Sequence, residues 1–420
     1  FERITRPLGL AVVAPPAERY FRWIWPRYEI RRPEKTPYFS SEILLAGAGR
    51  TIGLALSGGR DLDLRWIGAT HAAALLAAVI LLWRESGGLS LAGRAAAFGF
   101  GLFAFTDVGY VAPLNSFYTQ TGSLVYLAWT IALAVAAARR PGRIGPLAGY
   151  FAAAALFVTS KPQESVAAIP LAGFGLFLAF RGPRGPRRTG VAAAAVLALG
   201  AVGLAARTHH LYREGALYKM VFYEILPASP DPDGDLRLLG LPAADRAFAG
   251  TTTYRSDSPF QDPATRAGIF SSLGYGPLLR LYAARPARAL RELSGAARAG
   301  WELRPGFGNF PKAAGFPPGA RSSAYSAWSR IRRIALPAAG FLLLLVFAGN
   351  AAVAALGRLP DAARAGIATL VALGVFGYGL CALASAHIEI VRKLYVFHAV
   401  TDVLIATDLA VAVSWLEARH

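Results

Sequence analysis

The sequence predicts an all-α protein that crosses a membrane several times. Of its 420 residues, 55% are hydrophobic and only 16% are charged, and the mean hydropathy is +0.40. That balance is unusual for a soluble chain of this length. In addition, apolar runs recur at lengths close to the roughly 20 residues with which a helix crosses a hydrocarbon core about 30 Å thick. We therefore expect a polytopic membrane protein.

Residues 1–64 form the first segment, and they are too rich in Pro, Arg and Trp to be a membrane span. Tyr20, Trp23 and Trp25 lie among arginines, as in an interfacial aromatic belt. The stretch 41–57 predicts a short amphipathic helix that begins after a serine and ends at Ser-Gly-Gly. We expect an extracytoplasmic first-loop segment with interfacial helices.

The membrane helices follow from the lengths of the apolar runs. We expect about nine visible helices, six within 65–207 and three within 334–420. The predicted spans are about 65–84, 91–107, 121–138, 146–160, 165–181, 189–207, 334–356, 364–385 and 395–416. One more helix is expected upstream, because the chain does not start with methionine and Met220 is its only one.

Basic residues accumulate in alternate short loops, and this asymmetry predicts the orientation, since cytoplasmic loops carry the excess of Lys and Arg. The arginine-rich loops lie at 84–94, 139–143, 181–188 and 358–364. The loops between them lie at 108–120, 161–164 and 386–394 and carry fewer basic residues. We therefore expect these three loops outside a bacterial cytoplasmic (inner) membrane, and the C-terminus in the cytoplasm.

The segment 208–333 is the one long insertion, and the orientation places it outside the cytoplasm. The stretches 209–226 and 275–303 have helical spacing, whereas 229–235 and 305–320 are rich in turn residues. We expect a mostly helical extracytoplasmic loop domain, followed by the last three membrane helices and the cytoplasmic C-terminus in 334–420.

Composition excludes several functions. The net charge of +19 favours anionic membrane lipids over nucleic acid as a partner, because Lys and Arg occur in short clusters between apolar runs. A single cysteine, Cys381, provides no disulfide framework and no thiol-rich metal site. Asp231, Asp233 and Asp235 begin like an EF-hand loop, but Leu236 stands where a glycine is needed. We predict no metal and no cofactor; a divalent cation has no motif to support it.

A polar and aromatic stretch at 105–121 interrupts two apolar runs. Asp107 lies where a helix leaves the lipid, so its carboxylate can stay hydrated and act on a cation or a proton. The alternative is a polar helix cap within an aromatic interface belt. The other candidate pocket residues of this stretch are Tyr110, Asn115, Tyr118 and Gln120.

The next extracytoplasmic turn, at 159–165, brings Lys161, Gln163 and Glu164 to a helix junction. A lysine ammonium beside amide donors suits a phosphate group. The alternative is that Lys161 pairs with Glu164 or extends to the interface.

The last extracytoplasmic turn places His387, Glu389, Arg392 and Lys393 between two membrane helices, where charge is costly unless it is paired or used. The two basic side chains suit a lipid phosphate, and Glu389 can orient one of them. Further along, His398 and Asp402 share a helix face. For this pair we favour a polar contact between helices over a functional role.

Taken together, the sequences DVGYVAPLNSFYTQTGSLVYL, SKPQES and HIEIVRKLYVFHAVTD resemble the bacterial multi-spanning glycosyltransferases of the GT-C superfamily. The resemblance extends to YKMVFYEILPASPDPDGDLRLLGL and GFGNF, and so to most of the chain. It implies a GT-C-like fold and a site at the extracytoplasmic membrane surface. It also implies a polyprenyl-phosphate-linked sugar as donor, an acidic residue for the acceptor and basic residues for the lipid phosphate.

Carried over residue by residue, the resemblance makes Asp107 and Glu389 the catalytic candidates. The lipid-phosphate candidates are Lys161, Arg392, Lys393 and His387. The donor or acceptor pocket then includes Tyr110, Asn115, Tyr118, Gln120 and Gln163. Two departures stand out. Gln120 occupies a position where relatives often have an acid, and the acid of the first extracytoplasmic loop is expected upstream of Phe1, with Glu2 as the nearest substitute.

We therefore expect an integral-membrane glycosyltransferase that moves a hexosyl or pentosyl group from a polyprenyl phosphate to a surface glycan, a lipid or a protein. The first alternative is a catalytically degraded GT-C-like structural subunit bound to other subunits of a membrane complex. The second alternative is a transporter, for which Asp402 and Asp408 provide intramembrane charges.

Overall fold

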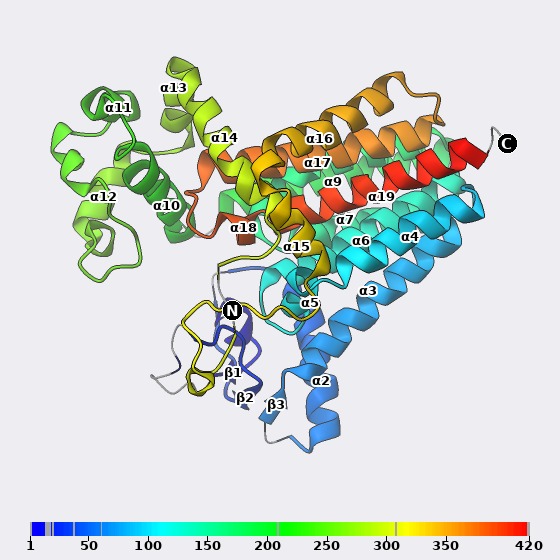
Figure 1. The fold of residues 1–420 in the computed structure, drawn as a ribbon, viewed down its shortest axis with the longest axis horizontal. Coiled ribbons are helices and arrows are strands. Elements are labelled where there is room, and N and C mark those ends of the chain that lie inside the picture. The colour runs from blue at the N-terminus through cyan, green and yellow to red at the C-terminus, as the bar shows by residue number, and fades with distance from the viewer. Residues whose placement is uncertain are drawn as a thin grey trace.

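The predicted fold class is confirmed: the protein is an all-α polytopic membrane protein with a helical bundle (Figure 1). The computed structural model describes residues 2–12, 18, 21–36, 38–59, 61–207, 210–306 and 309–417. Tyr20, placed in the predicted aromatic belt, lies outside the described residues.

Helices form at all the predicted spans within the described residues. The bundle helices are α3 (Arg65–Glu85), α4 (Leu91–Phe105), α6 (Thr119–Arg139), α7 (Ile144–Val158), α8 (Ala168–Phe180), α9 (Arg184–Arg207), α16 (Ala339–Leu356), α17 (Asp361–Ala384) and α19 (Tyr395–Glu417). Short helices at their ends are α5 (Val108–Leu114), the 3-10 helix η2 (Pro162–Ala167) and α18 (Ile390–Lys393).

The number of full spans is lower than the nine expected. In the described part of the chain, seven helices are long and apolar enough to cross a membrane, with η2 and α8 counted as one. The pair α4 and α5, bent by 67°, makes an eighth when it is taken as one broken span. The remaining predicted span is α7, an apolar helix of 15 residues, which is short for a full crossing.

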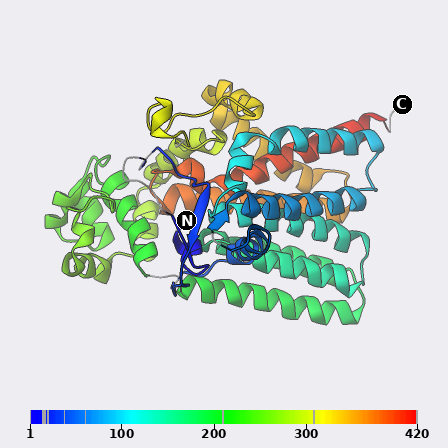
Figure 2. The same ribbon diagram turned by 90° about the horizontal axis from the view of Figure 1, so that it is seen from below.

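The bundle has two distinct ends. The turns at 106–118, 159–167 and 385–394 lie at one end, together with the segment 2–63 and the large insertion (Figures 1 and 2). We call this the loop end. The arginine-rich turns and the C-terminus lie at the other end. The structure thus groups the three candidate turns.

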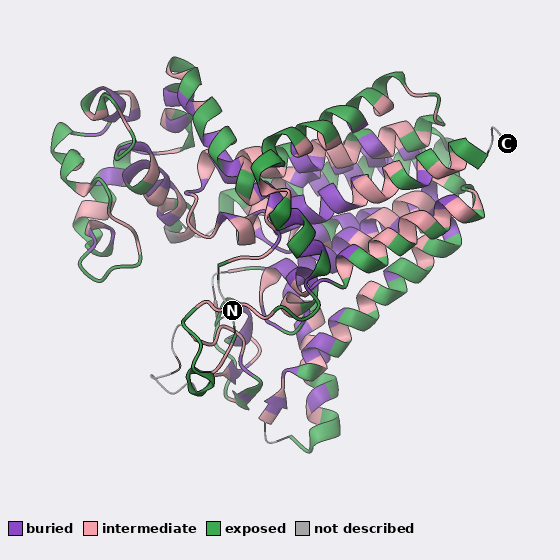
Figure 3. Ribbon diagram, viewed as in Figure 1, coloured by how far each residue is buried: buried purple, intermediate pink, exposed green. Residues whose placement is uncertain are grey.

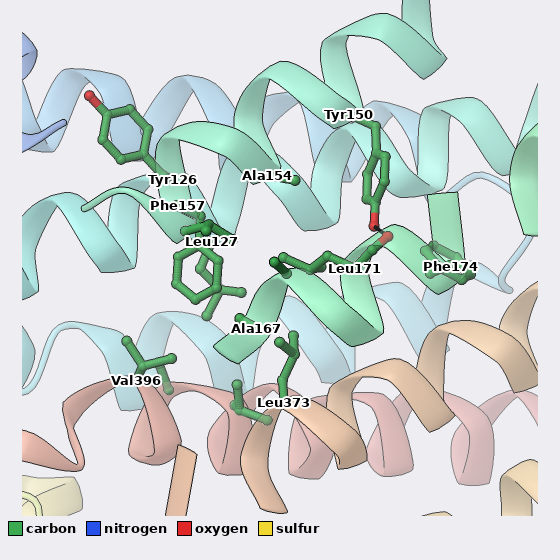
Figure 4. Close-up of a cluster of buried hydrophobic side chains, with 14 of the residues drawn as sticks. Tyr126, Leu127, Tyr150, Ala154, Phe157, Ala167, Leu171, Phe174, Leu373 and Val396 are labelled. Carbon is green, nitrogen blue, oxygen red and sulfur yellow. Dashed lines mark hydrogen bonds between the residues drawn. The ribbon is translucent and has the colours of Figure 1, made fainter. Parts of the chain in front are cut away.

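The bundle core is built from aromatic and small residues of α6, α7 and α8, with contributions from α17 and α19 (Figure 4). Tyr150 of α7 donates its hydroxyl hydrogen to the carbonyl oxygen of Leu171 in α8, at 2.7 Å. Because water is absent at this depth, such a bond removes an otherwise unsatisfied polar group. The outer faces of the bundle are lined with exposed residues (Figure 3).

The segment 2–63 forms a small N-terminal domain with a sheet that the sequence does not predict. It contains α1 (Glu2–Thr5), β1 (Leu10–Ala11), β2 (Arg27–Ile30), α2 (Glu42–Ser57) and β3 (Asp61–Asp63). The antiparallel order is β1-β2-β3, with Leu10 opposite Ile30 and Tyr28 opposite Leu62. Trp25 is only 8% exposed and packs in this domain's core, so it does not belong to an interfacial belt.

The insertion folds into a helical lobe with its own apolar core. Its elements are α10 (His210–Tyr218), the π-helix η3 (Lys219–Ile225), α11 (Pro232–Leu239), η4 (Ala243–Phe248), η5 (Pro259–Gln261), α12 (Pro263–Ser272), α13 (Tyr275–Ala284) and α14 (Pro286–Trp301). An irregular stretch then leads back to the bundle through η6 (Lys312–Ala314), α15 (Ala327–Ile334) and η7 (Leu336–Ala338). In that stretch Asn309 accepts hydrogen bonds from the backbone amides of Trp23 and Ile24, which ties it to the N-terminal domain.

Candidate functional site

Two of the three candidate turns meet around a buried lysine, Lys161, and a half-buried one, Lys393. Lys161 lies within electrostatic reach of Arg392 and Glu389, although more than 220 residues separate them in the sequence. Lys393 lies within electrostatic reach of Lys161 and of Lys219 from the lobe. The structure thus brings together three of the four predicted phosphate ligands.

A narrow cavity opens between these turns. It is lined at its polar end by Gln163, Glu164 and Lys393, and it contains about 410 Å³ of unfilled space including its open mouth. Only about 20 Å³ of this admits a water-sized sphere, so a ligand must push side chains apart. The rest of the lining is apolar and includes Phe157, Val166, Ala167, Leu373, Gly377, Leu380, Leu394, Val396 and Phe397. We call this space the lysine cavity.

Lys161 reaches the site because the chain turns sharply after α7. Its backbone is extended, with φ of −154°, and it directly precedes Pro162, which starts η2. The side chain is buried, and burial lowers the pKa of its ammonium group. Among the described residues no carboxylate lies within 4.0 Å of its Nζ atom. The alternative, a pairing of Lys161 with Glu164, is therefore present only as an electrostatic influence and not as an ion pair within 4.0 Å.

Lys393 is the second amine of the site, and it is half-buried. Its Nζ atom donates a hydrogen bond to the carbonyl oxygen of Ala386, at 2.6 Å. Burial, together with the neighbouring charges of Lys219 and Lys161, lowers the pKa of Lys393 to about 7. An anion placed between Lys161 and Lys393 relieves this repulsion and favours the charged form of both amines.

Arg392 is held at the rim by two neighbours. Its guanidinium group forms an ion pair with Glu389 and lies over the ring of Tyr118, 5.6 Å from the ring centre. Glu389 has a φ of +57°, a backbone conformation that is costly for a residue with a side chain. The Nε atom of Arg392 is buried without a hydrogen-bond partner in the structure. The strained turn therefore presents one unsatisfied donor beside the two lysines.

Gln163 lines the lysine cavity, and Glu164 lies beside it. The Nε2 atom of Gln163 lies 3.9 Å from the sulfur of Cys381, and its Oε1 atom is buried without a hydrogen-bond partner. Glu164 is 8% exposed and lines the same cavity. Glu164 adds a carboxylate that the residue-by-residue transfer did not include.

His387 is not part of the lysine cluster. Its backbone amide donates to Glu224 in η3, at 2.8 Å, and its Nε2 atom lies 3.7 Å from Glu292 in α14. Two carboxylates in these positions repel a phosphate. The structure therefore corrects the prediction for His387: it connects the turn at 385–394 to the lobe.

Asp107 takes the alternative role, that of a helix cap. One carboxylate oxygen accepts from the amide of Gly109 at 2.8 Å, and the other accepts from the amide of Ser329 at 2.8 Å. The side chain is 3% exposed, so it joins α5 to α15 in the protein interior. Each carboxylate oxygen thus already accepts a backbone hydrogen bond, which fits a structural cap better than a catalytic base.

A fully buried polar network lies next to this cap, and we call it the sealed network. Asp402 accepts hydrogen bonds from Arg332, Tyr110 and Trp328, with the Tyr110 bond at 2.6 Å. Arg332 and Asp402 are both fully buried, and Arg332 also donates to the carbonyl oxygen of Trp301. Asp402 therefore makes the predicted contact between helices, whereas Tyr110 belongs to this network and not to a pocket.

His398 makes the same kind of contact as Asp402. Its two ring nitrogens lie 3.0 Å from the carbonyl oxygen of Gly300 and 3.2 Å from that of Val391. The polar contact that we favoured for His398 is confirmed. Two further predicted pocket residues do not line the lysine cavity: Asn115 ends α5 with its Oδ1 atom against Gly68, and Gln120 is buried in the first turn of α6.

Sequence reasoning missed a second buried pair, Glu42 and His71. Their Oε1 and Nε2 atoms are 2.8 Å apart, and His71 Nδ1 lies 2.9 Å from the carbonyl oxygen of Leu114. Because a carbonyl oxygen only accepts, Nδ1 carries a hydrogen, and one proton must lie between Nε2 and Oε1. The pair links α2, α3 and α5. Glu42 gave no signal, because a glutamate in a first helical turn is common on exposed helices.

The aspartates at 231–235 hold the lobe together. Asp231 caps α11 and forms an ion pair with Arg285, and Asp235 is buried against Arg285 and Arg288. Within the described ranges no three metal-ligating side chains converge. These aspartates therefore form a capped turn, as the rejected EF-hand pattern implies.

Comparison with known proteins gives one family. Residues 1–419 match the family model described as the YfdI N-terminal transmembrane domain. No curated protein and no solved structure matches the chain.

Proposed function

Since that match spans nearly the whole chain, this protein belongs to the YfdI N-terminal transmembrane domain family, and we propose that it is a membrane glycosyltransferase of the GT-C type. In the proposed reaction a sugar passes from a polyprenyl-phosphate donor to an acceptor outside the cytoplasm, which is a surface glycan, a lipid or a protein. The proposed location is a bacterial cytoplasmic membrane, with the loop end outside.

The observation that supports this proposal best is the lysine cavity. Lys161, which is buried, and Lys393, which is half-buried, lack a carboxylate within 4.0 Å among the described residues. They adjoin a lining of apolar side chains that continues into the bundle core, where Phe157, Leu373 and Val396 lie close together (Figure 4). A site that is cationic at its mouth and apolar inside fits an anionic head group attached to a hydrocarbon chain.

The proposed chemistry assigns a task to each side chain. The bond between the sugar and the phosphate oxygen breaks, a bond from the acceptor oxygen to the sugar forms, and negative charge grows on the departing lipid phosphate. Lys161, Arg392 and Lys393 stabilise that charge. The acceptor proton goes to a carboxylate, and Glu389 and Glu164 are the two that adjoin these cations.

The motif resemblance to GT-C enzymes agrees with this arrangement for the turns at 159–165 and 386–394. It does not carry over for Asp107, Tyr110 and His387, whose contacts are structural. The transporter alternative receives no support from Asp402, since its charge is paired with Arg332 in a fully buried site.

The first experiment measures binding of farnesyl phosphate and farnesol to the purified protein by native mass spectrometry. We expect binding of the phosphate but not of the alcohol. Lys161→Met and Lys393→Met should each weaken it roughly tenfold or more, because each removes a charged hydrogen bond of about 1.5–3 kcal/mol. Lys312→Met, at an exposed lysine of η6, is the matched control and should bind like the wild type. Equal binding of farnesol, or unchanged binding by both cavity variants, contradicts the proposal.

The second experiment separates an enzyme from an inactive relative. Proteoliposomes are supplied with radiolabelled hexosyl and pentosyl polyprenyl phosphates, and release or transfer of the sugar is measured. We expect activity in the wild type, and loss of activity with retained phosphate binding in Glu389→Gln or Glu164→Gln. Phosphate binding without turnover of any donor supports the structural-subunit alternative, especially if the protein stably co-purifies with other subunits.

A further inference from the structure

Helix α2 distributes its side chains in the opposite way to a helix on a water-soluble protein. Its buried positions are Glu42, Ala46, Gly49 and Gly53, so small residues dominate the face that packs against the protein. Of its large apolar residues, Leu45 and Leu54 pack against the protein, whereas Leu44, Ile52 and Leu56 are exposed. In water the larger apolar side chains occupy the inner face, because burying them is the favourable step.

The inner face of α2 is small because α3 comes very close. A Cβ atom added to Gly49 would lie 3.0 Å from the Cα atom of Ile67, and one added to Gly53 would lie 2.9 Å from the ring of Trp66. Such close approach through Gly and Ala is the packing that helices use in lipid. The hydroxyl of Thr51 is satisfied within the helix, since it donates to the carbonyl oxygen of Gly47 at 3.0 Å.

The outer face of α2 has no partner in the described structure. Leu44 is 58% exposed, Ile52 46% and Leu56 65%, and with Ala48 they follow one another at intervals of four residues along one stripe. These exposed fractions resemble those of Leu344, at 65%, on the membrane helix α16. Glu42 is turned inward to His71, so Arg50, which is half-buried, is the other charged residue of the helix.

The orientation of α2 shows which surface lies beside it. The membrane helices run along the bundle axis, whereas α2 runs across it at the loop end and extends beyond the flank of α3 (Figures 1 and 2). A helix that crosses the axis of the spans lies along the plane of the membrane. The exposed stripe therefore lies at the level where lipid head groups meet acyl chains.

We propose that the stripe of Leu44, Ala48, Ile52 and Leu56 is a lipid-binding face that holds α2 in the outer leaflet, and that the bilayer is its partner. This contact also supports one wall of the lysine cavity. Just before α2, Ser41 donates its backbone amide to the carbonyl oxygen of Thr159, two residues before Lys161.

The hydrogen-bond link between α2 and the turn at 159–161 is extensive. Ser40 donates its hydroxyl hydrogen to the carbonyl oxygen of Ser160, and Ser41 donates its own to that of Leu156. A helix anchored in lipid at Leu44 and Leu56 thus sets the depth of Lys161 relative to the membrane surface. The inference does not depend on the proposed transfer reaction.

Spin labelling tests the lipid contact. Cysteines replace Leu44, Ile52 and Leu56 one at a time in a Cys381→Ala background, and each nitroxide is measured in proteoliposomes of phosphatidylethanolamine and phosphatidylglycerol. We expect collisions with oxygen to exceed collisions with a water-soluble nickel chelate, to the extent seen at Val196, a 71% exposed position in the membrane helix α9.

Two reference sites fix the other outcomes. A label at Ala264→Cys, on the exposed surface of the lobe, gives the reagent accessibility of a site in water. A label at Ala46→Cys gives the reagent accessibility of a buried site. High access to the nickel chelate at the α2 positions overturns the proposal. Low access to both reagents also overturns it, because it shows that a protein covers the stripe. Thermal unfolding of each variant, compared with the Cys381→Ala background, confirms that the fold is intact.

Discussion

Two groups of buried charge lie at the loop end of the bundle, and they are satisfied to very different degrees. In the sealed network, Asp402 receives three hydrogen-bond donors and Arg332 has both a carboxylate and backbone carbonyl oxygens as partners. At the lysine cavity, Lys161 and Lys393 lie within electrostatic reach of each other, and neither has a carboxylate within 4.0 Å among the described residues. The first group is complete without a ligand, and the second is not.

This difference teaches how to separate structural from functional charge in a membrane protein. Both groups are buried, and both come from segments that look polar in the sequence. A buried ion pair with every hydrogen bond made stabilises one arrangement of helices, whereas like charges beside an apolar channel are retained at a cost. Removing a charge from the sealed network should therefore destabilise the protein, whereas removing one from the lysine cavity should stabilise it.

The largest effect is expected in the sealed network. Asp402→Leu leaves the Arg332 cation buried without its carboxylate, which should cost about 3–5 kcal/mol of the free energy of unfolding. Thermal unfolding in detergent checks this, with Asp361→Leu at an exposed aspartate as the control. The double variant Arg332→Met with Asp402→Leu should recover part of the loss. A single variant as stable as the control contradicts the structural role.

In the lysine cavity, removing a charge is expected to raise the free energy of unfolding. Because the pKa of Lys393 is lowered to about 7, its folded form binds protons less tightly than its unfolded form, and the charge destabilises the protein below the unfolded pKa. Lys393→Met should therefore raise the free energy of unfolding by about 1–3 kcal/mol at pH 7.5. The wild type should gain stability as pH rises from about 7 toward 10.5, and the variant should not. A variant that is less stable at pH 7.5 argues against a strained cation.

The same titration should govern binding. Lys393 is charged below pH 7 and neutral above it, so affinity for a sugar polyprenyl phosphate should fall as pH rises from 6 to 8.5, with a midpoint that bound phosphate shifts above about 7. The proposed donor is a phosphodiester, whose own charge is constant in this range. Binding measured across these pH values in Lys393→Met should show a much flatter profile. If the affinity of the wild type does not change with pH, Lys393 does not bind the phosphate.

The smallest expected effect on stability is at Asp107, where two variants distinguish a helix cap from a catalytic base. Asp107→Ala should lower the free energy of unfolding by about 1–2 kcal/mol, since two backbone amides lose their acceptor. Asp107→Asn retains an acceptor oxygen and should keep most of both the stability and the donor turnover. Turnover and unfolding are measured on the same preparations. If the Asn variant is fully stable but inactive, then Asp107 acts in catalysis.

Much of the fold could be predicted because the bilayer imposes simple rules. Apolar length alone located the membrane helices, and α7 was overcounted only because a 15-residue helix falls just short of a full crossing. The sheet of the N-terminal domain could not be predicted. Its strands are two to four residues long, and the residues that pair lie 18 to 36 positions apart in the sequence, so no alternation identifies them.

The candidate residues that could be predicted are those that lie in short polar turns of the sequence. Lys161, Gln163, Arg392 and Lys393 lie in short polar turns between apolar runs, and such positions are informative because charge there is expensive. The partners of Asp402 were out of reach, since Arg332 belongs to an amphipathic helix 70 residues away and looked like an exposed basic residue. Pairings of this kind depend on tertiary packing.

The most direct test of the central claim is a density map of the protein in nanodiscs with a short-chain polyprenyl phosphate. We predict phosphate density within hydrogen-bond distance of Lys161 and Lys393, with the first isoprene units between Phe157, Leu373 and Val396. Lipid phosphate bound elsewhere on the loop end, with the cavity closed and the two amines unchanged, contradicts the account.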